Sequence, residues 1–367
     1  MLLDRLYIEA FRNIKTVSLT GFGNTNLFYG ENGSGKTSIL EAIYTLSAAR
    51  SFRTHKWRSL ISHGEIAFTV SGSVINAAGV ETKLGVRRAL QEASAFVRVD
   101  GQTVKTASSL AQALPIQVID SATFSLLEGA PEKRRQLMDW LVFHVEPQRF
   151  LPIWQRYGKA LQHRNALLRQ QNASVSEELV YWTREVATAG DEINTLRESL
   201  FSAFVPVVME VYGTINEQSS QPVEINLSYH PGWDRETSLR ERLESSLDRD
   251  LELGYTRDGP HRADIRARAA GKPALEVLSR GQLKSLIASF RVGQAKLLRQ
   301  YGINSVVLVD DLPAELDDSR RRALCRILSQ LGLQVFYTSI EQDDLASCFE
   351  EQPKRFHVKH GQVIPHA

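Results

Sequence analysis

The stretch that decides the fold reads Asn26-Leu27-Phe28-Tyr29-Gly30-Glu31-Asn32-Gly33-Ser34-Gly35-Lys36-Thr37. Its first four residues are typical of a strand, and the other eight match the pattern G-x-x-x-x-G-K-[ST] in full. Apolar residues then recur at the spacing of one helix face, at Ile39, Leu40, Ile43 and Leu46. A strand, a phosphate-binding loop and a helix in this order predict a nucleotide-binding domain.

Each residue type in this loop has a physical reason. The glycines let successive backbone N–H groups turn toward phosphate oxygens, and the following helix directs its positive end at the same anion. Lys36 is expected to reach the β- and γ-phosphates of ATP, and Thr37 to offer its hydroxyl to Mg²⁺. The candidate ATP-binding residues here are Gly30, Glu31, Asn32, Gly33, Ser34, Gly35, Lys36 and Thr37.

A second motif supplies the acids that such a site needs. The run Ser305–Asp311 reads as a buried strand that ends in two aspartates. We expect Asp310 to hold Mg²⁺ together with Thr37, and Asp311 to orient the attacking water. The predicted catalytic residues are therefore Asp311, Asp310 and Lys36, and the predicted metal ligands are Thr37 and Asp310.

Leu278-Ser279-Arg280-Gly281-Gln282 precedes a predicted helix and resembles the signature motif of ATP-binding-cassette ATPases. That resemblance implies that Ser279, Arg280, Gly281 and Gln282 bind the γ-phosphate held by a second protomer. Transporter ATPases usually have Gly where Arg280 stands, and their loop-to-signature segment is far shorter. Val335–Ser339 resembles the switch strand of these ATPases, with Thr338 or Ser339 in the switch position, and Gln117 is a candidate Q-loop residue.

Composition excludes several other classes of protein. The 367 residues carry 44 Lys and Arg against 42 Asp and Glu, so the net charge of +2 argues neither for nor against nucleic acid. No run approaches the roughly 20 apolar residues of a membrane span, and Asp4 stands where a signal peptide has its basic region. Cys325 and Cys348 are too few for a disulfide framework. We expect a cytoplasmic protein without a membrane partner.

Two local clusters of basic residues suggest phosphate contacts. The segment 50–58 contains no acid, and residues 131–170 carry eight Lys and Arg against three acids. The candidate DNA-binding residues are Arg50, Arg53, Lys56, Lys133, Arg134 and Arg135. The first cluster is alternatively a solvated loop or a lateral contact to nucleotide. In the second, the arginines alternatively pair with acids such as Glu128 or Glu132, or fasten one part of the protein to another.

Hydrophobic patterns divide the chain into three segments. Residues 131–201 are expected to be mainly helical, between two segments with strand signals. Taken with the resemblance to cassette ATPases, this implies that residues 1–122 form the first part of an ATPase head, 123–208 an inserted helical lid, and 209–367 the second part of the head. Strands are predicted at Leu6–Phe11, Asn26–Tyr29, Glu65–Val74, Thr82–Arg88, Ala95–Val99, Ile116–Ile119, Val223–Tyr229, Glu252–Thr256, Ala263–Arg268 and Ser305–Val309. The sequence contains no sustained heptad repeat, which the long coiled-coil arms of SMC and Rad50 ATPases would require.

Together these residues resemble the RecF family, bacterial recombination-mediator ATPases, over essentially the whole chain. Beyond the nucleotide motifs, the marks of the resemblance are Phe11-Arg12-Asn13, Ala49–Arg53, Leu126–Pro131 followed by Arg134-Arg135, and Gly259–Asp264. The fold class that this implies is α/β, with an ABC-type P-loop NTPase head similar to those of Rad50 and SMC, and an inserted helical lid subdomain.

The resemblance implies a function as well. It implies an ATP- and Mg²⁺-dependent homodimer on gapped or junction DNA, bound without regard to sequence, and a slow DNA-stimulated ATPase that times dimerisation. It implies RecR and RecO as partners, loading of RecA, and roles in gap repair, replication restart and the SOS response. One alternative is an ATP-gated DNA-binding module with nearly vestigial hydrolysis, since Asp311 stands where cassette ATPases usually have Glu. A transporter ATPase subunit is disfavoured.

Overall fold

The computed structural model describes residues 2–170, 176–217 and 223–365. Its contacts divide the chain into two compact units. The first unit, called the head, comprises Met1–Ser125, Glu210–Ser220 and Arg280–Ala367. The second, called the lid, comprises Leu126–Met209 and Gln221–Ser279. Unlike the sequence-based boundaries, this division groups residues 221–279 with the helices, because β10 pairs with β9 and packs on α3.

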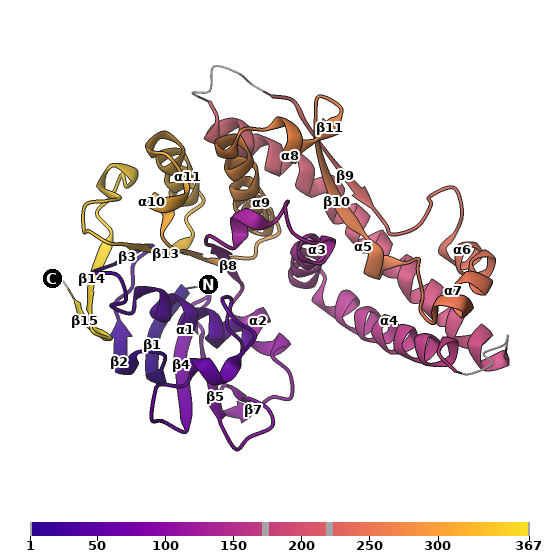
Figure 1. Cartoon of the computed structure of the whole chain (residues 1–367). Coiled ribbons are helices and arrows are strands. Elements are labelled where there is room, and N and C mark those ends of the chain that lie inside the picture. The colour runs from indigo at the N-terminus through magenta and orange to yellow at the C-terminus, as the bar shows by residue number, and fades with distance from the viewer. Residues whose placement is uncertain (1, 171–175, 218–222, 366–367) are drawn as a thin grey trace. The chain divides into compact units, whose positions relative to one another are not determined.

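Within the described residues, the head contains two six-stranded sheets (Figure 1). In the mainly parallel sheet the strand order is β15 (Gln362–Pro365), β14 (Lys354–Lys359), β3 (Thr25–Tyr29), β13 (Gln334–Ser339), β12 (Val306–Val309) and β8 (Ile116–Ile119). The antiparallel sheet has the order β2 (Ile14–Thr20), β1 (Leu2–Phe11), β4 (Ala67–Ile75), β5 (Glu81–Ala89), β6 (Phe96–Val99) and β7 (Gln102–Thr103).

Helix α1 (Lys36–Ala48) contacts both sheets, and its buried side chains join them into one core. Ile39, Leu40 and Ile43 are fully buried there, as the helical spacing of the sequence predicts. The remaining helical elements of the head are α2 (Ser108–Ala113), α9 (Arg280–Gln300), α10 (Leu312–Glu315), α11 (Asp318–Gln330), η1 (Trp57–Leu60), η2 (Thr123–Ser125) and η4 (Ala346–Cys348). The α/β fold class predicted from the sequence is confirmed.

The lid is built around three long helices and a small sheet. Its elements are α3 (Pro131–Val145), α4 (Pro147–Leu168), α5 (Glu177–Ile215, whose last turns belong to the head), β9 (Ile225–His230), α6 (Leu239–Ser245), α7 (Leu247–Leu253), η3 (Pro260–Arg262), β10 (Asp264–Ala269), β11 (Lys272–Pro273) and α8 (Ala274–Val277). One of its ion pairs is fully buried. Arg164 pairs with Asp250 at 2.8 Å, and both side chains are fully buried.

One strand predicted from the sequence is wrong. Residues 252–256 do not form a strand, since α7 runs to Leu253 and ends at Gly254 in the left-handed conformation. Acids in the first turn of α7 and glycine after its last residue are ordinary helix signals, and they outweigh the short apolar pattern. Strands β2, β14 and β15 were not predicted. Exposed polar or charged residues interrupt the apolar pattern in β2 and β14, and β15 is only four residues long.

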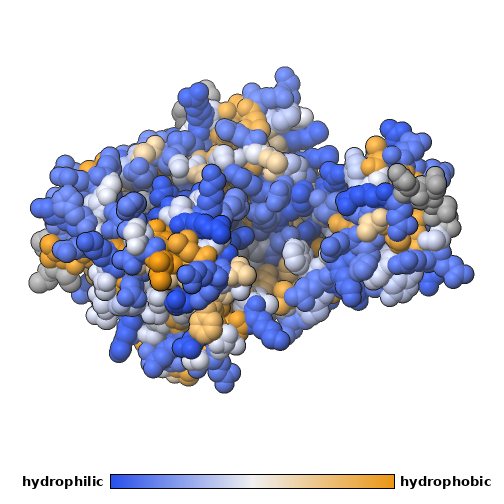
Figure 2. Space-filling view, turned by 60° about the horizontal axis from the view of Figure 1, so that its bottom comes forward, coloured by the Kyte–Doolittle hydropathy of each residue, from blue (hydrophilic) through white to orange (hydrophobic). Residues whose placement is uncertain are grey.

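Helix α5 would pass for a membrane span by length and composition alone, because an 18-residue stretch of it has a mean hydropathy of 1.2. Core helices of soluble proteins pass the same test, and 44% of this stretch is buried within the protein. Val186, Ala189 and Ile193 are among its fully buried side chains. Figure 2 shows a face of the molecule on which hydrophilic side chains predominate and apolar ones form separate patches.

Candidate nucleotide-binding site

The phosphate loop joins the end of β3 to the start of α1 and is held tightly against the parallel sheet. The backbone N–H of Gly30 donates to the carbonyl oxygen of Ile340 at 3.0 Å. Gly30 has φ of 148°, and a Cβ atom there would lie 2.2 Å from the carbonyl oxygen of Val358. Only glycine fits this position. The first glycine of the motif is therefore required because the loop backbone packs directly against β14.

Lys36 lies inside the curl of the loop. Its Nζ donates to the carbonyl oxygens of Gly30 at 2.5 Å and Glu31 at 2.9 Å. Burial lowers the pKa of Lys36, and the carboxylates of Asp310 and Asp311 oppose this. Ser34 Oγ is also buried and has no hydrogen-bond partner within the described residues. A buried ammonium group and a buried hydroxyl without a partner fit a phosphate group.

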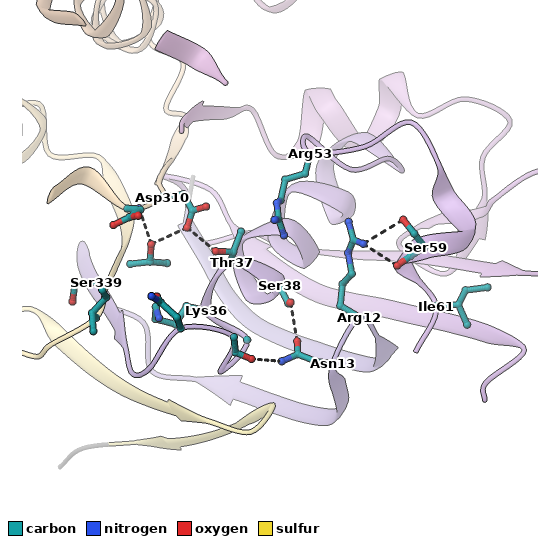
Figure 3. A pocket seen from close by; sticks show the side chains of 16 residues that line it. Arg12, Asn13, Lys36, Thr37, Ser38, Arg53, Ser59, Ile61, Asp310 and Ser339 are labelled. Atoms are coloured by element: carbon teal, nitrogen blue, oxygen red, sulfur yellow. Dashed lines mark hydrogen bonds between the residues drawn. The ribbon is translucent and has the colours of Figure 1, made fainter. Parts of the chain in front are cut away.

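Two hydroxyl groups converge on one carboxylate oxygen beside the loop. Thr37 Oγ1 donates to Asp310 Oδ1 at 3.0 Å, and Thr338 Oγ1 donates to the same oxygen at 2.8 Å (Figure 3). Burial raises the pKa of Asp310, while these two hydrogen bonds and the charge of Arg53 lower it. A hydroxyl and a carboxylate oxygen at this distance match the two protein ligands that Mg²⁺ takes in P-loop ATPases.

The residues present fit a metal held mainly by nucleotide. No group of three or more His, Cys, Asp or Glu side chains is placed to bind a metal within residues 2–170, 176–217 and 223–365. Mg²⁺ commonly keeps several waters and binds through one or two protein groups together with substrate phosphates. Thr37 and Asp310 can supply those protein groups, and Lys36 lies beside them on the wall of the same cavity.

Asp311 follows in the left-handed conformation, with φ of 53°. Its backbone N–H donates to Thr338 Oγ1 at 2.9 Å, so one threonine hydroxyl contacts both consecutive aspartates. Ser339 Oγ instead donates to the carbonyl oxygen of Glu341 at 2.6 Å. Of the two switch candidates, the geometry therefore favours Thr338. Gln117 is buried inside β8 opposite Val307, and it does not line the cavity.

A cavity of about 500 Å³ lies over the loop and the two aspartates. In addition to predicted site residues, its walls include Arg12, Asn13, Ser38, Ser59 and Ile61. Figure 3 shows Arg12 and Asn13 on one side of it and Asp310 on the other.

Asn13 was not predicted as a site residue. Its Nδ2 donates to the Gly33 carbonyl oxygen at 3.1 Å, and its Oδ1 accepts from Ser38 Oγ at 2.8 Å, so it holds the loop in shape. Its place in the Phe11-Arg12-Asn13 motif was the only sequence signal for it.

The signature residues lie where the chain passes from the lid to the head. Ser279 and Arg280 are exposed, and α9 begins at Arg280. A Cβ on Gly281 would lie 2.9 Å from an Arg320 guanidinium nitrogen, so a side chain here would displace Arg320. Arg280, Gly281 and Gln282 do not line the cavity of their own chain. Arg280 lies on the surface of the head, whereas Gly281 and Gln282 are partly buried.

The basic candidates fall into different environments. Arg50, Arg53 and Lys56 are exposed, and Arg53 also lines the nucleotide cavity. The side chain of Arg53 points toward Thr37 in Figure 3. This matches the alternative in which the first cluster contacts nucleotide from the side.

In the second cluster Lys133 is exposed, whereas Arg134 is buried. Arg134 Nε donates to Asp264 Oδ1 at 2.7 Å, and its Nη1 donates to the carbonyl oxygen of Gly129 at 2.8 Å. Arg135 is partly buried and donates to the Ala263 carbonyl oxygen at 3.0 Å. We remove Arg134 from the candidate DNA surface, because its guanidinium group is committed to internal partners. Its acid partner is Asp264 rather than Glu128 or Glu132.

A phosphate loop after β3, a carboxylate after β12 and an antiparallel sheet packed on α1 define a P-loop ATPase head of the ABC type.

A family model described as the RecF/RecN/SMC N terminal domain matches residues 2–363. The DNA replication and repair protein RecF of Pseudomonas aeruginosa (strain UCBPP-PA14) is 45% identical over 366 residues, which cover 99% of this chain and 97% of that protein. The RecF protein of Pseudomonas putida (strain GB-1) is 43% identical, with 99% and 98% covered. The chain belongs to the RecF family of DNA replication and repair proteins.

Solved structures agree with this assignment. A structure of the recombination mediator protein RecF with ATP in the RecFOR pathway matches with a TM-score of 0.85 and 26% identity, covering 100% of this chain and 97% of that chain. An SMC head bound to the C-terminal winged-helix domain of ScpA matches with a TM-score of 0.61 and 16% identity. The latter likeness concerns the fold alone. The ABC-type head predicted from the motifs is confirmed.

Proposed function

We propose that this protein is an ATP-dependent DNA-binding recombination mediator that acts at gaps and single-strand/double-strand junctions. In this proposal ATP closes two copies into a dimer on DNA, and slow, DNA-stimulated hydrolysis reopens it. RecO and RecR are the proposed partners in loading RecA during gap repair, replication restart and the SOS response. The proposed location is the cytoplasm. The support for this assignment is the similarity of this chain to the solved structure of RecF with ATP, a recombination mediator protein of the RecFOR pathway.

One observation carries the ATPase part of the proposal: the hydroxyl groups of Thr37 and Thr338 both donate to the same carboxylate oxygen of Asp310. We assign the γ-phosphate to Lys36 and the loop N–H groups, and the metal to Thr37 and Asp310. Mg²⁺, when bound, neutralises charge on the phosphates. Asp311 is assigned to orient the attacking water. The hydroxyl oxygen of Thr338 accepts a hydrogen bond from the backbone N–H of Asp311 and so holds that backbone in place.

The dimer part of the proposal starts from the signature segment. Ser279 and Arg280 are exposed at the start of α9, and residues 280–282 do not line the cavity of their own chain. The N–H groups at the start of a 21-residue helix form a site for an anion. We assign Ser279, Arg280, Gly281 and Gln282 to the γ-phosphate of a second copy. Residues 126–209 and 221–279 are assigned to the lid.

One specific observation favours the alternative with nearly vestigial hydrolysis. Asp311 is one methylene shorter than the Glu usual in cassette ATPases, so its carboxylate reaches less far toward an attacking water. Comparing steady-state ATP hydrolysis with and without gapped DNA separates the two functions. Stimulation by DNA supports the timed clamp, and an unmeasurable rate under both conditions supports the gated module.

The DNA-binding part is tested with gapped, fully duplex and single-stranded fluorescent DNA, each titrated in ATP, in ADP and without nucleotide. We expect the tightest binding to gapped DNA in ATP. Equal affinity in all three nucleotide states would contradict the proposal. Lys36→Ala serves as the matched control, because it should bind DNA as the wild type does without nucleotide.

A further inference from the structure

A cation–aromatic cluster lies on the segment that borders the nucleotide cavity. Trp57 begins the short helix η1, and two guanidinium groups lie against its ring. The Cζ atom of Arg58 is 4.9 Å from the ring centroid, and that of Arg88 is 4.1 Å from it. Both distances fall within the range of about 6 Å in which a cation is attracted to an aromatic face. Arg88 comes from β5, so the cluster joins two elements that are distant in sequence.

The two positive charges lack compensation by acids. Within the described ranges neither Arg58 nor Arg88 forms an ion pair, and the Nε atom of Arg88 is buried without a hydrogen-bond partner. Burial lowers the pKa of Arg88, and the nearby charge of Arg58 lowers it further. Arg87, the preceding residue, differs in this respect because it pairs with Glu92 at 2.5 Å. Two neighbouring cations without an acid are stabilised when an anion binds between or beside them.

The segment that presents this cluster is fixed at both ends. Ser51 Oγ accepts from the backbone N–H groups of Arg53 and Thr54 at 2.9 and 3.1 Å. At the other end Arg12 Nη1 donates to the carbonyl oxygen of Ser59 at 2.9 Å. The backbone that carries Trp57 and Arg58 is therefore held in place, and Arg88 is carried by strand β5.

We propose that Arg58 and Arg88, gathered on the ring of Trp57, form a binding site for backbone phosphates of DNA. This site deepens the proposed DNA-binding function and rests on it. Guanidinium groups pair readily with phosphate oxygens. Trp57 acts as a platform that holds the two cations at a fixed spacing, and it is not a surface for stacking bases. Arg53, Ser59 and Ile61 of the same segment line the nucleotide cavity, so the segment links DNA contact to the nucleotide site.

The test measures the affinity of the full-length protein for duplex and gapped DNA at several salt concentrations, with saturating ATP. Each phosphate contact contributes about 0.9 to the slope of log K against log salt on duplex DNA. The double variant Arg58→Gln/Arg88→Gln should flatten the slope by up to about 1.8. Arg87→Gln is the matched control, because it removes one positive charge from the same strand and should leave the slope unchanged.

Further measurements exclude indirect effects. ATP affinity and the melting temperature should stay at wild-type values in both variants, and Trp57→Leu, which keeps both charges, should weaken DNA binding less than the double variant does. Arg58→Glu changes only an exposed residue, and it should weaken DNA binding more than Arg58→Gln.

An unchanged salt slope in a double variant that binds ATP normally would overturn the inference, as would equal weakening by Arg87→Gln. A competition with inorganic phosphate is run at constant ionic strength. If inorganic phosphate displaces DNA at a concentration similar to that of the DNA phosphates, the site binds free phosphate rather than the DNA backbone, and the inference is overturned. Failure of the wild-type protein to bind DNA would instead contradict the proposed function.

Discussion

Thr37 and Asp310 lie 273 positions apart in the chain, yet Thr37 Oγ1 donates a hydrogen bond to Asp310 Oδ1 at 3.0 Å. The contact arises because β3 and β12 both border β13 in the parallel sheet, with their carboxyl ends at one edge. Ligands of open α/β sheets bind at such edges. The predictions below test what this edge and its surroundings do.

Lys36→Ala should abolish ATP binding, because Lys36 is the one cationic side chain within the loop Gly30–Thr37. DNA binding that depends on ATP should be lost with it. Titration with a fluorescent ATP analogue measures the effect. Lys83→Ala, which alters an exposed lysine on β5, is the control and should bind nucleotide normally. Normal nucleotide affinity in Lys36→Ala would disprove the assignment of the loop.

Asp311→Asn should bind ATP as tightly as the wild type but hydrolyse it at least tenfold more slowly. Asn also tolerates the left-handed backbone conformation at this position, so the fold of the loop should be kept. Single-turnover hydrolysis and equilibrium ATP binding measure the two properties separately. If hydrolysis continues at the wild-type rate, Asp311 does not orient the water.

Arg134→Ala should destabilise the lid and leave the salt dependence of DNA binding unchanged. The variant leaves the carboxylate of Asp264 without its partner in a partly buried setting, a loss of about 3 kcal/mol. Thermal unfolding combined with salt titration measures both effects. Arg149→Ala removes an exposed arginine from α4 and should melt like the wild type. A stable Arg134→Ala protein with a flatter salt slope would return Arg134 to the DNA surface.

The stability of the lid should depend on the protonation of His261. Tyr157 Oη donates to His261 Nδ1 at 2.6 Å, and His261 Nε2 donates to the carbonyl oxygen of Thr256 at 3.0 Å. Burial lowers the pKa of His261 to about 4. Because the unfolded chain takes up this proton near the ordinary histidine pKa of about 6.5, the unfolded state binds more protons between these values.

This group should therefore contribute full stability above about pH 6.5 and lose roughly 3 kcal/mol as the pH falls to about 4. Chemical denaturation at closely spaced pH values measures the slope. His261→Gln provides the comparison, since it has no proton to gain in this range. Identical slopes for the wild type and His261→Gln would show that His261 is not held neutral in the folded protein.

The sequence could predict that Thr37 and Asp310 lie close together because each motif there is local. The loop Gly30–Thr37 and the strand before Asp310 can be recognised without their neighbours, and parallel strands bring their carboxyl ends together. The spacing of apolar residues also predicted α1, since one face of that helix is buried against both sheets.

The basic residues could not be sorted in the same way. Arg134 looks like a surface cation in the sequence, and only tertiary folding brings the carboxylate of Asp264 within 2.7 Å of it. Asn13 and Arg88 were missed for a similar reason. Their partners, the loop carbonyl of Gly33 and the ring of Trp57, come from other elements. A helix cap at Gly254, rather than the apolar pattern, decided the structure of residues 252–256.

The central claim is that ATP joins two copies through the signature segment of each. Sedimentation velocity of the wild-type protein and Ser279→Arg, in ATP, in ADP and without nucleotide, tests it most directly. We predict a dimer only for the wild type in ATP, and monomers of Ser279→Arg that still bind ATP with wild-type affinity. An ATP-dependent dimer of Ser279→Arg, or a wild-type protein that is monomeric in ATP, would contradict the account.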